Sequence, residues 1–227
     1  MYKAFFFDMD GVLFDSMPHH ARAWEVVMQR YDLGFTARDT YLQEGRTGQD
    51  VIGECYRKRY GTEPAEDLVW QIYKEKTELF HSLGPTVPVK GIEAVLHYLK
   101  ALASEPQIWI VTGSGQQTLF DQLEETFPSV FRRDRMVTAY DVHHGKPDPE
   151  PYLRAWEQSG CAKEECMVVE NAPLGIRSGK GAGLFTVGVN TGVLERADLE
   201  REGADRVFDS MEGLLEYLEL TIGQLTI

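Results

Sequence analysis

Six short apolar runs, separated by segments of helical periodicity, constrain the fold of this chain more than any other feature. They cover residues 3–7, 107–111, 135–139, 166–169, 184–189 and 206–208. Continuous apolar runs of this length are typical of strands that are buried on both faces, as in parallel sheets. The intervening segments carry apolar stripes at helical spacing, such as Ile92, Val95, Leu96 and Leu99. This alternation predicts an α/β fold with a doubly wound, mainly parallel sheet.

One long segment interrupts the alternation. Residues 16–83 show helical periodicity and no strand pattern, which indicates a block of helices inserted after the first strand. The return linker, residues 84–88, reads GPTVP, and its glycine and prolines are typical of an inter-domain hinge. We therefore expect a core of residues 1–14 and 89–227 and a helical cap of residues 15–88. The hinges are expected near residues 14–16 and 84–89.

The bulk composition excludes several classes of partner. A net charge of -13 argues against binding to nucleic acid or to an anionic membrane, which both need clustered Lys and Arg. Three cysteines do not indicate a disulfide framework. The apolar run at the N-terminus is too short for a signal peptide, and no stretch approaches the roughly 18 apolar residues of a membrane helix. We expect a cytoplasmic, monomeric enzyme with a small-molecule substrate.

Polar residues stand where the first four predicted strands end. In open α/β sheets, ligands bind beyond the carboxyl ends of the strands, so these residues are expected to meet in one crevice. In chain order they are Asp8 and Asp10, then Thr112, Gly113 and Ser114, then Lys146 in GKPDPEPY, then Glu170 and Asn171.

Each of these residues also has a purely structural explanation. Asp10 precedes a glycine in a possible turn, Thr112 and Asn171 are good helix caps, and lysines such as Lys146 are usually exposed. Alternatively, Thr112 to Ser114 can form an anion site with backbone N–H groups at the start of a helix. A dinucleotide loop is weakly indicated, because Thr118 replaces the third glycine of GxGxxG. The joint placement favours a catalytic site.

Two carboxylates, a lysine and a divalent cation are a suitable set for phosphoryl transfer. Asp8 can attack a phosphoryl group and form an aspartyl-phosphate, although two unit charges 4 Å apart repel by roughly 4 kcal/mol at a dielectric constant of 20. Mg²⁺ and Lys146 offset that repulsion. Asp10 is then placed to act as general acid and base, worth on the order of 10² to 10⁴ in rate. The cap excludes water during the first step.

Four motifs resemble those of the haloacid dehalogenase superfamily: DMDGVLFDS, VTGSG, GKPDPEPY and VVENAPLGI. The inserted helices resemble the small cap of the β-phosphoglucomutase-like branch, where His20 on the first cap helix also finds a match. The resemblance implies that His20 contacts the substrate or shifts the proton balance near Asp10. It further implies a nucleophile at Asp8, an acid/base at Asp10, phosphate binding by Thr112 and Lys146, and Mg²⁺ held by Asp8, the Asp10 carbonyl, Glu170 and Asn171.

The sequence departs from this family pattern at two positions. Asn171 stands where the family usually has an aspartate, so the site lacks one negative charge. In the cap loop, residues 43–50, Gly48 stands where mutases carry a phosphate-gripping arginine, although Arg46 is close. Glu44, in the same loop, reaches the metal and restores the charge if the cap closes tightly. Because EGRTG and ENAPLG resemble an inorganic pyrophosphatase of this branch, we hypothesise that the substrate is pyrophosphate.

Several other functions remain open at the level of sequence. The first is a phosphatase of small sugar or organic phosphates, or a β-phosphoglucomutase, and spacing alone does not exclude a dehalogenase. The second is a signalling receiver domain, although its phosphorylated aspartate would end a later strand and no helical cap would be expected. The third is a non-catalytic binding module, which the complete set of catalytic residues disfavours.

Overall fold

The centre of the molecule is a parallel sheet of six strands. The computed structural model describes residues 2–114 and 119–222. All five pairings in the sheet are parallel, and the strand order is β3-β2-β1-β4-β5-β6. The predicted α/β fold with its parallel sheet is therefore confirmed. The strands are β1 (Ala4–Phe7), β2 (Gln107–Val111), β3 (Met136–Val137), β4 (Cys166–Glu170), β5 (Phe185–Val189) and β6 (Arg206–Phe208).

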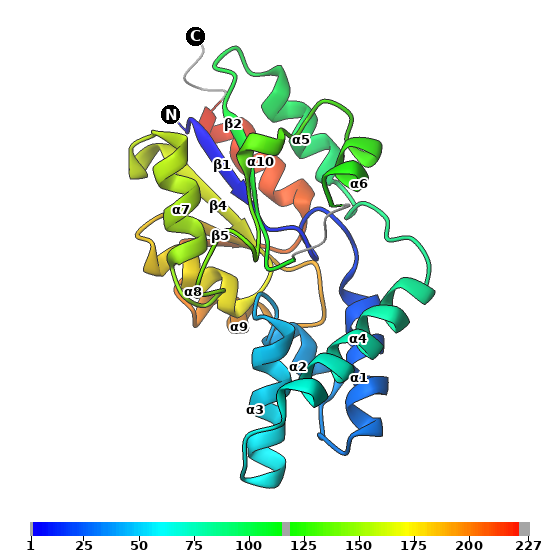
Figure 1. Cartoon of the computed structure of the whole chain (residues 1–227). Helices are drawn as coiled ribbons and strands as arrows, with labels where there is room; N and C mark the ends of the chain where they lie inside the picture. Colours follow the sequence, from blue (N-terminus) through cyan, green and yellow to red (C-terminus); the bar gives the residue numbers. More distant parts are fainter. Residues whose placement is uncertain (1, 115–118, 223–227) are drawn as a thin grey trace.

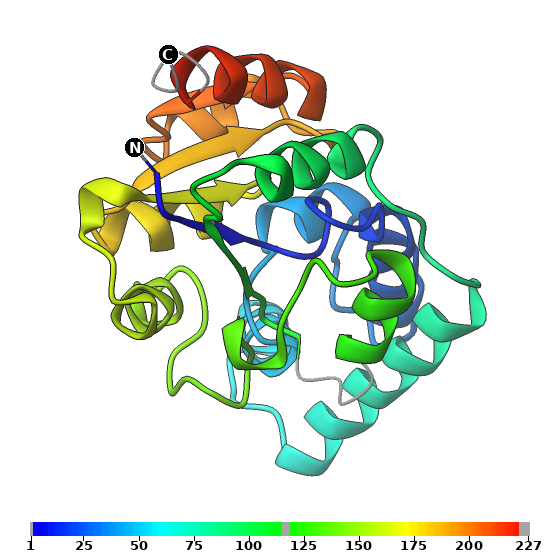
Figure 2. The same cartoon turned by 90° about the horizontal axis from the view of Figure 1, so that it is seen from above.

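Helices cover both faces of the sheet (Figures 1 and 2). Successive side chains of a strand point to opposite faces, so Phe5 and Phe7 enter one apolar layer while Ala4 and Phe6 enter the other. The first layer is closed by α5 (Ile92–Ala101), α6 (Leu119–Thr126) and α10 (Met211–Ile222). The second is closed by α7 (Glu150–Ser159), and α8 (Pro173–Gly181) packs against β4 and β5. Burial on both faces explains why the strand sequences are continuously apolar.

Four helices follow β1 and lie apart from the sheet (Figure 1). They are α1 (Met17–Arg30), α2 (Ala37–Leu42), α3 (Gly48–Tyr60) and α4 (Glu66–Ser82). Three of them, α1, α3 and α4, share an apolar core of their own, which includes Trp24, Val27, Ile52 and Ile72. This helical block matches the predicted cap in position, while the cap boundaries at residues 15 and 88 stay a prediction.

Two short helices were not expected from the sequence. The first, α2, has six residues and begins with a capping box in which Thr36 and Asp39 bond each other's backbone N–H groups. The second, α9 (Arg196–Glu200), has five residues, and at its start the Asp198 side chain accepts from the Glu195 backbone N–H at 3.0 Å. Helices this short lack a full apolar stripe, so periodicity does not detect them.

Besides its two linkers, the cap contacts the core at a second place. Tyr41 of α2 and Met17 of α1 enter one apolar cluster with Ile176 and Leu199 of the core. Arg38 Nη2 lies 3.1 Å from Asp198 Oδ2 in the same region. These contacts hold the cap over the carboxyl edge of the sheet, where the predicted site residues lie. Within the described ranges, no helix is both long and apolar enough to cross a membrane.

Candidate active site

Asp8 occupies the centre of the site, directly after β1. Its side chain is buried, and Lys146 Nζ lies 2.5 Å from Asp8 Oδ1. The Asp8 carboxyl is removed from water and lies near the negative charges of Glu170 and Asp10. Burial therefore raises the pKa of Asp8 to about 7, although Lys146 acts in the opposite direction. Asp8 is thus a carboxyl whose ionisation depends on compensating positive charge.

Lys146 reaches Asp8 from the loop between β3 and α7. Its ammonium group donates to Asp8 Oδ1 at 2.5 Å, to Glu170 Oε1 at 2.6 Å and to the Val111 carbonyl at 3.0 Å. Burial alone would disfavour the charged form, but Asp8 and Glu170 outweigh it and raise the pKa of Lys146. An ammonium has three N–H donors, so these contacts use all of them. A further acceptor could therefore bind the Lys146 ammonium only if Lys146 gives up one of these three partners.

Glu170 is the last residue of β4, and both oxygens of its carboxylate accept hydrogen bonds. Its Oε1 accepts from Lys146 and, at 2.7 Å, from the hydroxyl of Tyr152, while its Oε2 accepts from the Asn171 backbone N–H at 3.1 Å. A Cβ built on Gly175 would lie 2.0 Å from the Glu170 carboxylate, so only glycine fits there. These contacts make Glu170 a fixed anchor for Lys146. Its predicted role as a metal ligand stays a prediction.

Asp10 connects the core to the cap through a chain of hydrogen bonds. Its Oδ1 accepts from Ser16 Oγ at 2.5 Å and lies 3.3 Å from His20 Nε2, while His20 Nδ1 lies 2.8 Å from Lys76 Nζ. Because an ammonium only donates, His20 Nδ1 accepts and Nε2 carries the proton that faces Asp10. Burial raises the pKa of Asp10, but His20 and Ser16 outweigh it, so that the net pKa is lowered.

Burial lowers the pKa of two basic groups near Asp10, Lys76 and His20. Burial lowers the pKa of Lys76 to about 8, although Asp10 and Glu44 act in the opposite direction. Burial and the neighbouring Lys76 lower the pKa of His20. His20 therefore contacts Asp10 as a neutral donor, and both of its predicted roles stay predictions.

Thr112, Gly113 and Ser114 follow β2, and the Thr112 hydroxyl accepts from the Ser114 backbone N–H at 3.0 Å. A Cβ on Gly113 would lie 3.3 Å from the Gly45 carbonyl oxygen, so this loop contacts the cap loop closely. The helix expected directly after Ser114 is described only from Leu119 onward, and Thr118 lies outside the described residues. Phosphate binding by this loop stays a prediction.

The cap loop brings Glu44 and Arg46 to a cavity of about 210 Å³ between cap and core, which Asp10, His20 and Ser114 also line. Gly45 approaches so closely that its Cβ would lie 2.9 Å from Lys146 Cδ. Burial and the charges of Asp10 and Asp8 raise the pKa of Glu44 well above its usual range. Glu44 thus belongs to the same group of carboxyls. Arg46, in contrast, is paired with Glu54 and donates to Gln43 Oε1 at 2.8 Å.

Two buried oxygens in the site lack hydrogen-bond partners among the described residues: Asp8 Oδ2 and Asn171 Oδ1. Unpaired buried acceptors are costly and therefore indicate a missing ligand. Carboxylate and amide oxygens are donors that suit Mg²⁺. The donor set therefore fits Mg²⁺, with Asp8 and Asn171 as the residues that would hold it. Asn171 does not cap α8, because the N-cap is Ala172.

Three further residues of the site were not found from the sequence: Ser16, Lys76 and Tyr152. Tyr152 lies in the GKPDPEPY motif, six residues after Lys146, so the motif itself could have indicated it. Lys76 could not be recognised, since it lies on a cap helix 66 residues from Asp10 and only the fold brings the two together.

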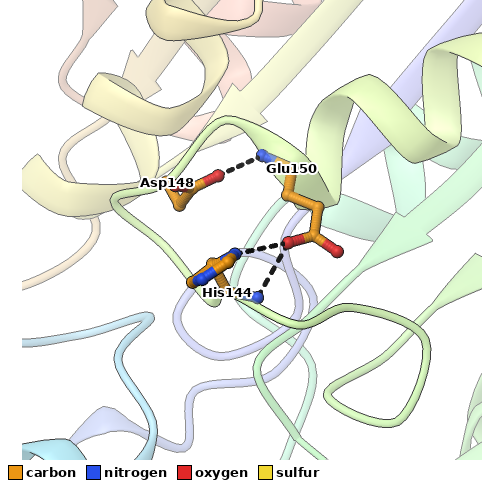
Figure 3. A group of neighbouring side chains, drawn as sticks. All are labelled: His144, Asp148 and Glu150. Atoms are coloured by element: carbon orange, nitrogen blue, oxygen red, sulfur yellow. Dashed lines mark hydrogen bonds and ion pairs between the residues drawn. The ribbon is translucent and has the colours of Figure 1, made fainter.

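A second group of ligand-type side chains lies beside the Lys146 loop: His144, Asp148 and Glu150 (Figure 3). Their hydrogen bonds support the loop itself. Glu150 accepts from the backbone N–H groups of His143 and His144, at 2.7 and 2.8 Å, and from the His144 ring at 3.0 Å. Asp148 Oδ1 accepts from the Glu150 backbone N–H at 2.9 Å. The group thus fixes the segment that carries Lys146.

The fold and the arrangement of Asp8, Asp10, Lys146 and Glu170 define a class of capped α/β hydrolases with an aspartate at the end of the first strand. The model of the haloacid dehalogenase-like hydrolases matches residues 2–183. The chain belongs to this family of hydrolases, in its β-phosphoglucomutase-like branch.

Individual relatives agree with this assignment. Hexitol phosphatase A of Escherichia coli is 32% identical over 192 residues, which cover 83% of this chain and 83% of that protein. The β-phosphoglucomutase of Bacillus subtilis is 25% identical over 202 residues, 84% of each chain. A solved structure from Bacteroides vulgatus, provisionally described as a β-phosphoglucomutase, is 41% identical with a TM-score of 0.93 and covers 100% of this chain and 91% of that one.

Proposed function

We propose that this protein is a Mg²⁺-dependent phosphatase of small sugar or polyol phosphates that works through an aspartyl-phosphate on Asp8. One observation carries the proposal: Lys146 and two oxygens without partners, Asp8 Oδ2 and Asn171 Oδ1, converge where the central strands end. Family members generally use Mg²⁺, which when bound neutralises charge on the phosphoryl oxygens and on Asp8.

In the first step, one carboxylate oxygen of Asp8 attacks phosphorus, and the bond from phosphorus to the leaving oxygen breaks. Lys146 shifts from Asp8 toward the phosphoryl oxygens while Glu170 and the Val111 carbonyl keep it in place. The negative charge of the bound phosphate raises the pKa of Asp10, so that Asp10 can carry the proton it gives to the leaving oxygen.

In the second step, Asp10 takes a proton from water, and this water attacks the phosphorus of the aspartyl-phosphate. The acyl-phosphate bond breaks, which releases inorganic phosphate and restores the Asp8 carboxylate. Ser16 and His20 hold Asp10 in place for both proton transfers, because each donates to its Oδ1.

The names of the relatives favour a sugar or polyol phosphate over pyrophosphate. Hexitol phosphatase A and fructose-1-phosphate phosphatase YqaB, both from Escherichia coli, and the phosphorylated carbohydrates phosphatase of Thermotoga maritima each act on a phosphorylated carbohydrate by name. A cavity of about 210 Å³ beside Asp10 offers room for a small leaving group.

Pyrophosphate is a second candidate, and Glu44 is the observation that favours it. Glu44 lines the cavity together with Asp10, and burial and the negative charges of Asp10 and Asp8 raise its pKa. A carboxyl in such surroundings ionises only when extra positive charge is present. A substrate that is itself rich in negative charge, and that brings additional Mg²⁺, would supply that condition.

A substrate panel separates these candidates. Phosphate release should be measured with hexitol phosphates, hexose phosphates, phosphoglycolate and pyrophosphate, with Mg²⁺ and with EDTA. We expect Mg²⁺-dependent turnover that is highest on the sugar or polyol phosphates. Asp8→Asn should abolish turnover, whereas Asp15→Asn, at an exposed aspartate seven residues away, should leave it within about twofold, because surface changes have small effects.

The panel also contains the outcomes that decide against each candidate. Turnover in EDTA equal to that in Mg²⁺, or an active Asp8→Asn protein, would contradict the mechanism. Turnover confined to pyrophosphate would replace the first candidate by the second. In that case Glu44→Gln should lower pyrophosphate turnover by at least about tenfold, as expected for the loss of a group that acts on charge in the site.

A further inference from the structure

The backbone just before Lys146 has little packing to hold it. His143 and His144 are both exposed. The same segment also lines a second cavity, of about 90 Å³, with His143, Gly145 and Lys146 among its walls. A stretch that is exposed to solvent and borders empty space has few apolar contacts to fix it. The position of this backbone therefore depends on hydrogen bonds more than on close packing.

Glu150 supplies those hydrogen bonds from the first turn of α7. Its Oε1 accepts from the His143 backbone N–H at 2.7 Å, and its Oε2 accepts from the His144 backbone N–H at 2.8 Å. The His144 ring Nδ1 lies 3.0 Å from the same Oε2 (Figure 3). An ionised carboxylate only accepts, so all three groups are donors and both oxygens are engaged. Bonds of this charge-assisted kind are about twice as strong as neutral ones.

The backbone just after Lys146 is held by different contacts. The Asp148 backbone N–H donates to the Gly145 carbonyl at 3.0 Å, and the Asp148 carbonyl accepts from Ser178 Oγ of α8 at 2.6 Å. Lys146 thus stands between two anchored stretches of chain. The stretch before it is the one that the Glu150 side chain anchors.

The Lys146 ammonium leaves little tolerance for movement of that backbone. Its Nζ lies 2.5 Å from Asp8 Oδ1 and 2.6 Å from Glu170 Oε1. A displacement of about 1 Å would take either distance beyond the range of a good hydrogen bond. The Lys146 side chain is only 2% exposed, so it has little room to compensate by adopting another rotamer.

We propose that Glu150 is a positioning residue, which sets where the Lys146 ammonium stands relative to Asp8. It does so by binding the two backbone N–H groups of His143 and His144. The inference rests on the proposed function, in which Lys146 stabilises charge on the phosphoryl oxygens. Because Lys146 contacts Asp8 before any substrate arrives, Glu150 affects the transition state more than the binding of substrate.

The test uses Glu150→Gln, which keeps the shape but replaces one accepting oxygen by an NH₂ group that cannot accept. The matched control is Glu157→Gln, which removes the same charge at an exposed position of the same helix. On the best substrate of the panel, Glu150→Gln should lower kcat about tenfold and change KM less than twofold, as for a slightly misplaced catalytic group. Glu157→Gln should keep at least about half of the wild-type kcat.

A double-mutant cycle decides whether Glu150 acts through Lys146. The readout is the Kd of orthovanadate in Mg²⁺, measured by calorimetry, because this ion imitates the phosphoryl group during transfer and its binding needs no turnover. Glu150→Gln should raise Kd about tenfold when Lys146 is present, but less than twofold in a Lys146→Met protein, since residues that act as a unit are not additive. Equal losses in both backgrounds would indicate a general structural effect and overturn the inference.

A wild-type kcat in Glu150→Gln would overturn it as well. If Glu150→Gln does not fold, Glu150→Asp, which keeps the charge but shortens the reach, enters the same cycle and must show the same dependence on Lys146. A wild-type enzyme that hydrolyses no organic phosphate contradicts the proposed function. Good wild-type turnover together with an unaffected Glu150→Gln protein contradicts only this inference.

Discussion

At the residue scale, the site holds three ionisable side chains, Asp8, Lys146 and Glu170, that are almost fully buried. They lie within hydrogen-bonding distance of one another through the Lys146 ammonium. Asp8 and Glu170 both contact Lys146 Nζ, at 2.5 and 2.6 Å, so the three together carry one excess negative charge when ionised. Removing charges from water is expensive, and an incompletely compensated group rarely stabilises a fold. This excess negative charge is what a bound divalent cation, as proposed above, would compensate.

The raised pKa of Asp8 predicts a stability effect in the metal-free protein. Its pKa of about 7 exceeds the ordinary value of 3.8, so the folded state binds more protons than the unfolded state between these pH values. The stabilising contribution is complete below about pH 4 and is lost as the pH rises through 7. In EDTA at pH 8, Asp8→Asn should thus unfold at a higher temperature than wild type, by about 3–6 °C, as for 1–2 kcal/mol in a chain of this size.

Differential scanning calorimetry at pH 5 and pH 8 checks this expectation. The difference between Asp8→Asn and wild type should be smaller at pH 5, where Asp8 in the folded protein is already protonated. Asp15→Asn serves as the control and should show no such pH-dependent difference. An Asp8→Asn protein that is less stable than wild type at pH 8 would contradict the pKa assignment.

At the element scale, close packing of α8 against the end of β4 fixes Glu170. The helix begins at Pro173 beyond the N-cap Ala172, and Gly175 in its first turn faces the Glu170 carboxylate. No other residue fits at this position, because any Cβ would overlap the carboxylate. The helix thereby sets the position of Glu170 and, through it, that of Lys146.

Gly175→Ala should therefore damage catalysis more than folding. Its Cβ would start 2.0 Å from the Glu170 carboxylate, so the carboxylate must shift by more than 1 Å and lose its contacts with Lys146 and Tyr152. We expect kcat to fall by on the order of 10²-fold, the usual cost of a misplacement of this size. Steady-state kinetics and a thermal melt measure the two effects.

The matched control is Gly181→Ala in the same helix. A Cβ on Gly181 would lie 3.4 Å from Pro149, which is ordinary van der Waals contact. This variant should keep at least about half of the wild-type kcat, as expected for a change that displaces nothing. If both variants lose activity equally, the helix as a whole rather than the contact with Glu170 is responsible.

At the scale of the whole molecule, the cap rests on the core through α2 as well as through its two linkers. Tyr41 is buried in the cluster shared by cap and core, and a Cβ on Gly192 would lie 2.9 Å from its ring. Arg38 and Asp198 add an ion pair across the same boundary. Because the cavity lined by Asp10 and His20 lies between cap and core, these contacts help to set how closely the cap approaches the core.

Tyr41→Ala should shift the molecule toward an open cap. The loss of a buried aromatic contact should raise KM several-fold and increase the radius of gyration in small-angle X-ray scattering, because the closed state loses on the order of 2 kcal/mol or more of apolar burial. Tyr60→Ala is the control, since Tyr60 is exposed at the far end of α3. Unchanged KM and scattering in Tyr41→Ala would show that α2 does not control closure.

The fold and most of the core site could be predicted from the sequence. Continuous apolar runs marked all six strands, because a strand buried on both faces cannot alternate with polar residues. Asp8, Lys146 and Glu170 could be placed together for a topological reason, since the carboxyl ends of parallel strands meet at one edge. The short helices α2 and α9 were missed, because their capping residues act locally and leave no periodic stripe.

The sequence by itself determined the sheet, the inserted helices and the place of Asp8 at the end of the first strand, since each of these follows from local periodicity or from position at a strand end. Only the tertiary structure decided which partners those groups have. The contacts of His20 with Asp10 and of Tyr41 with the core depend on how the cap sits on the sheet. That placement results from packing between segments far apart in the chain, and no short-range pattern encodes it.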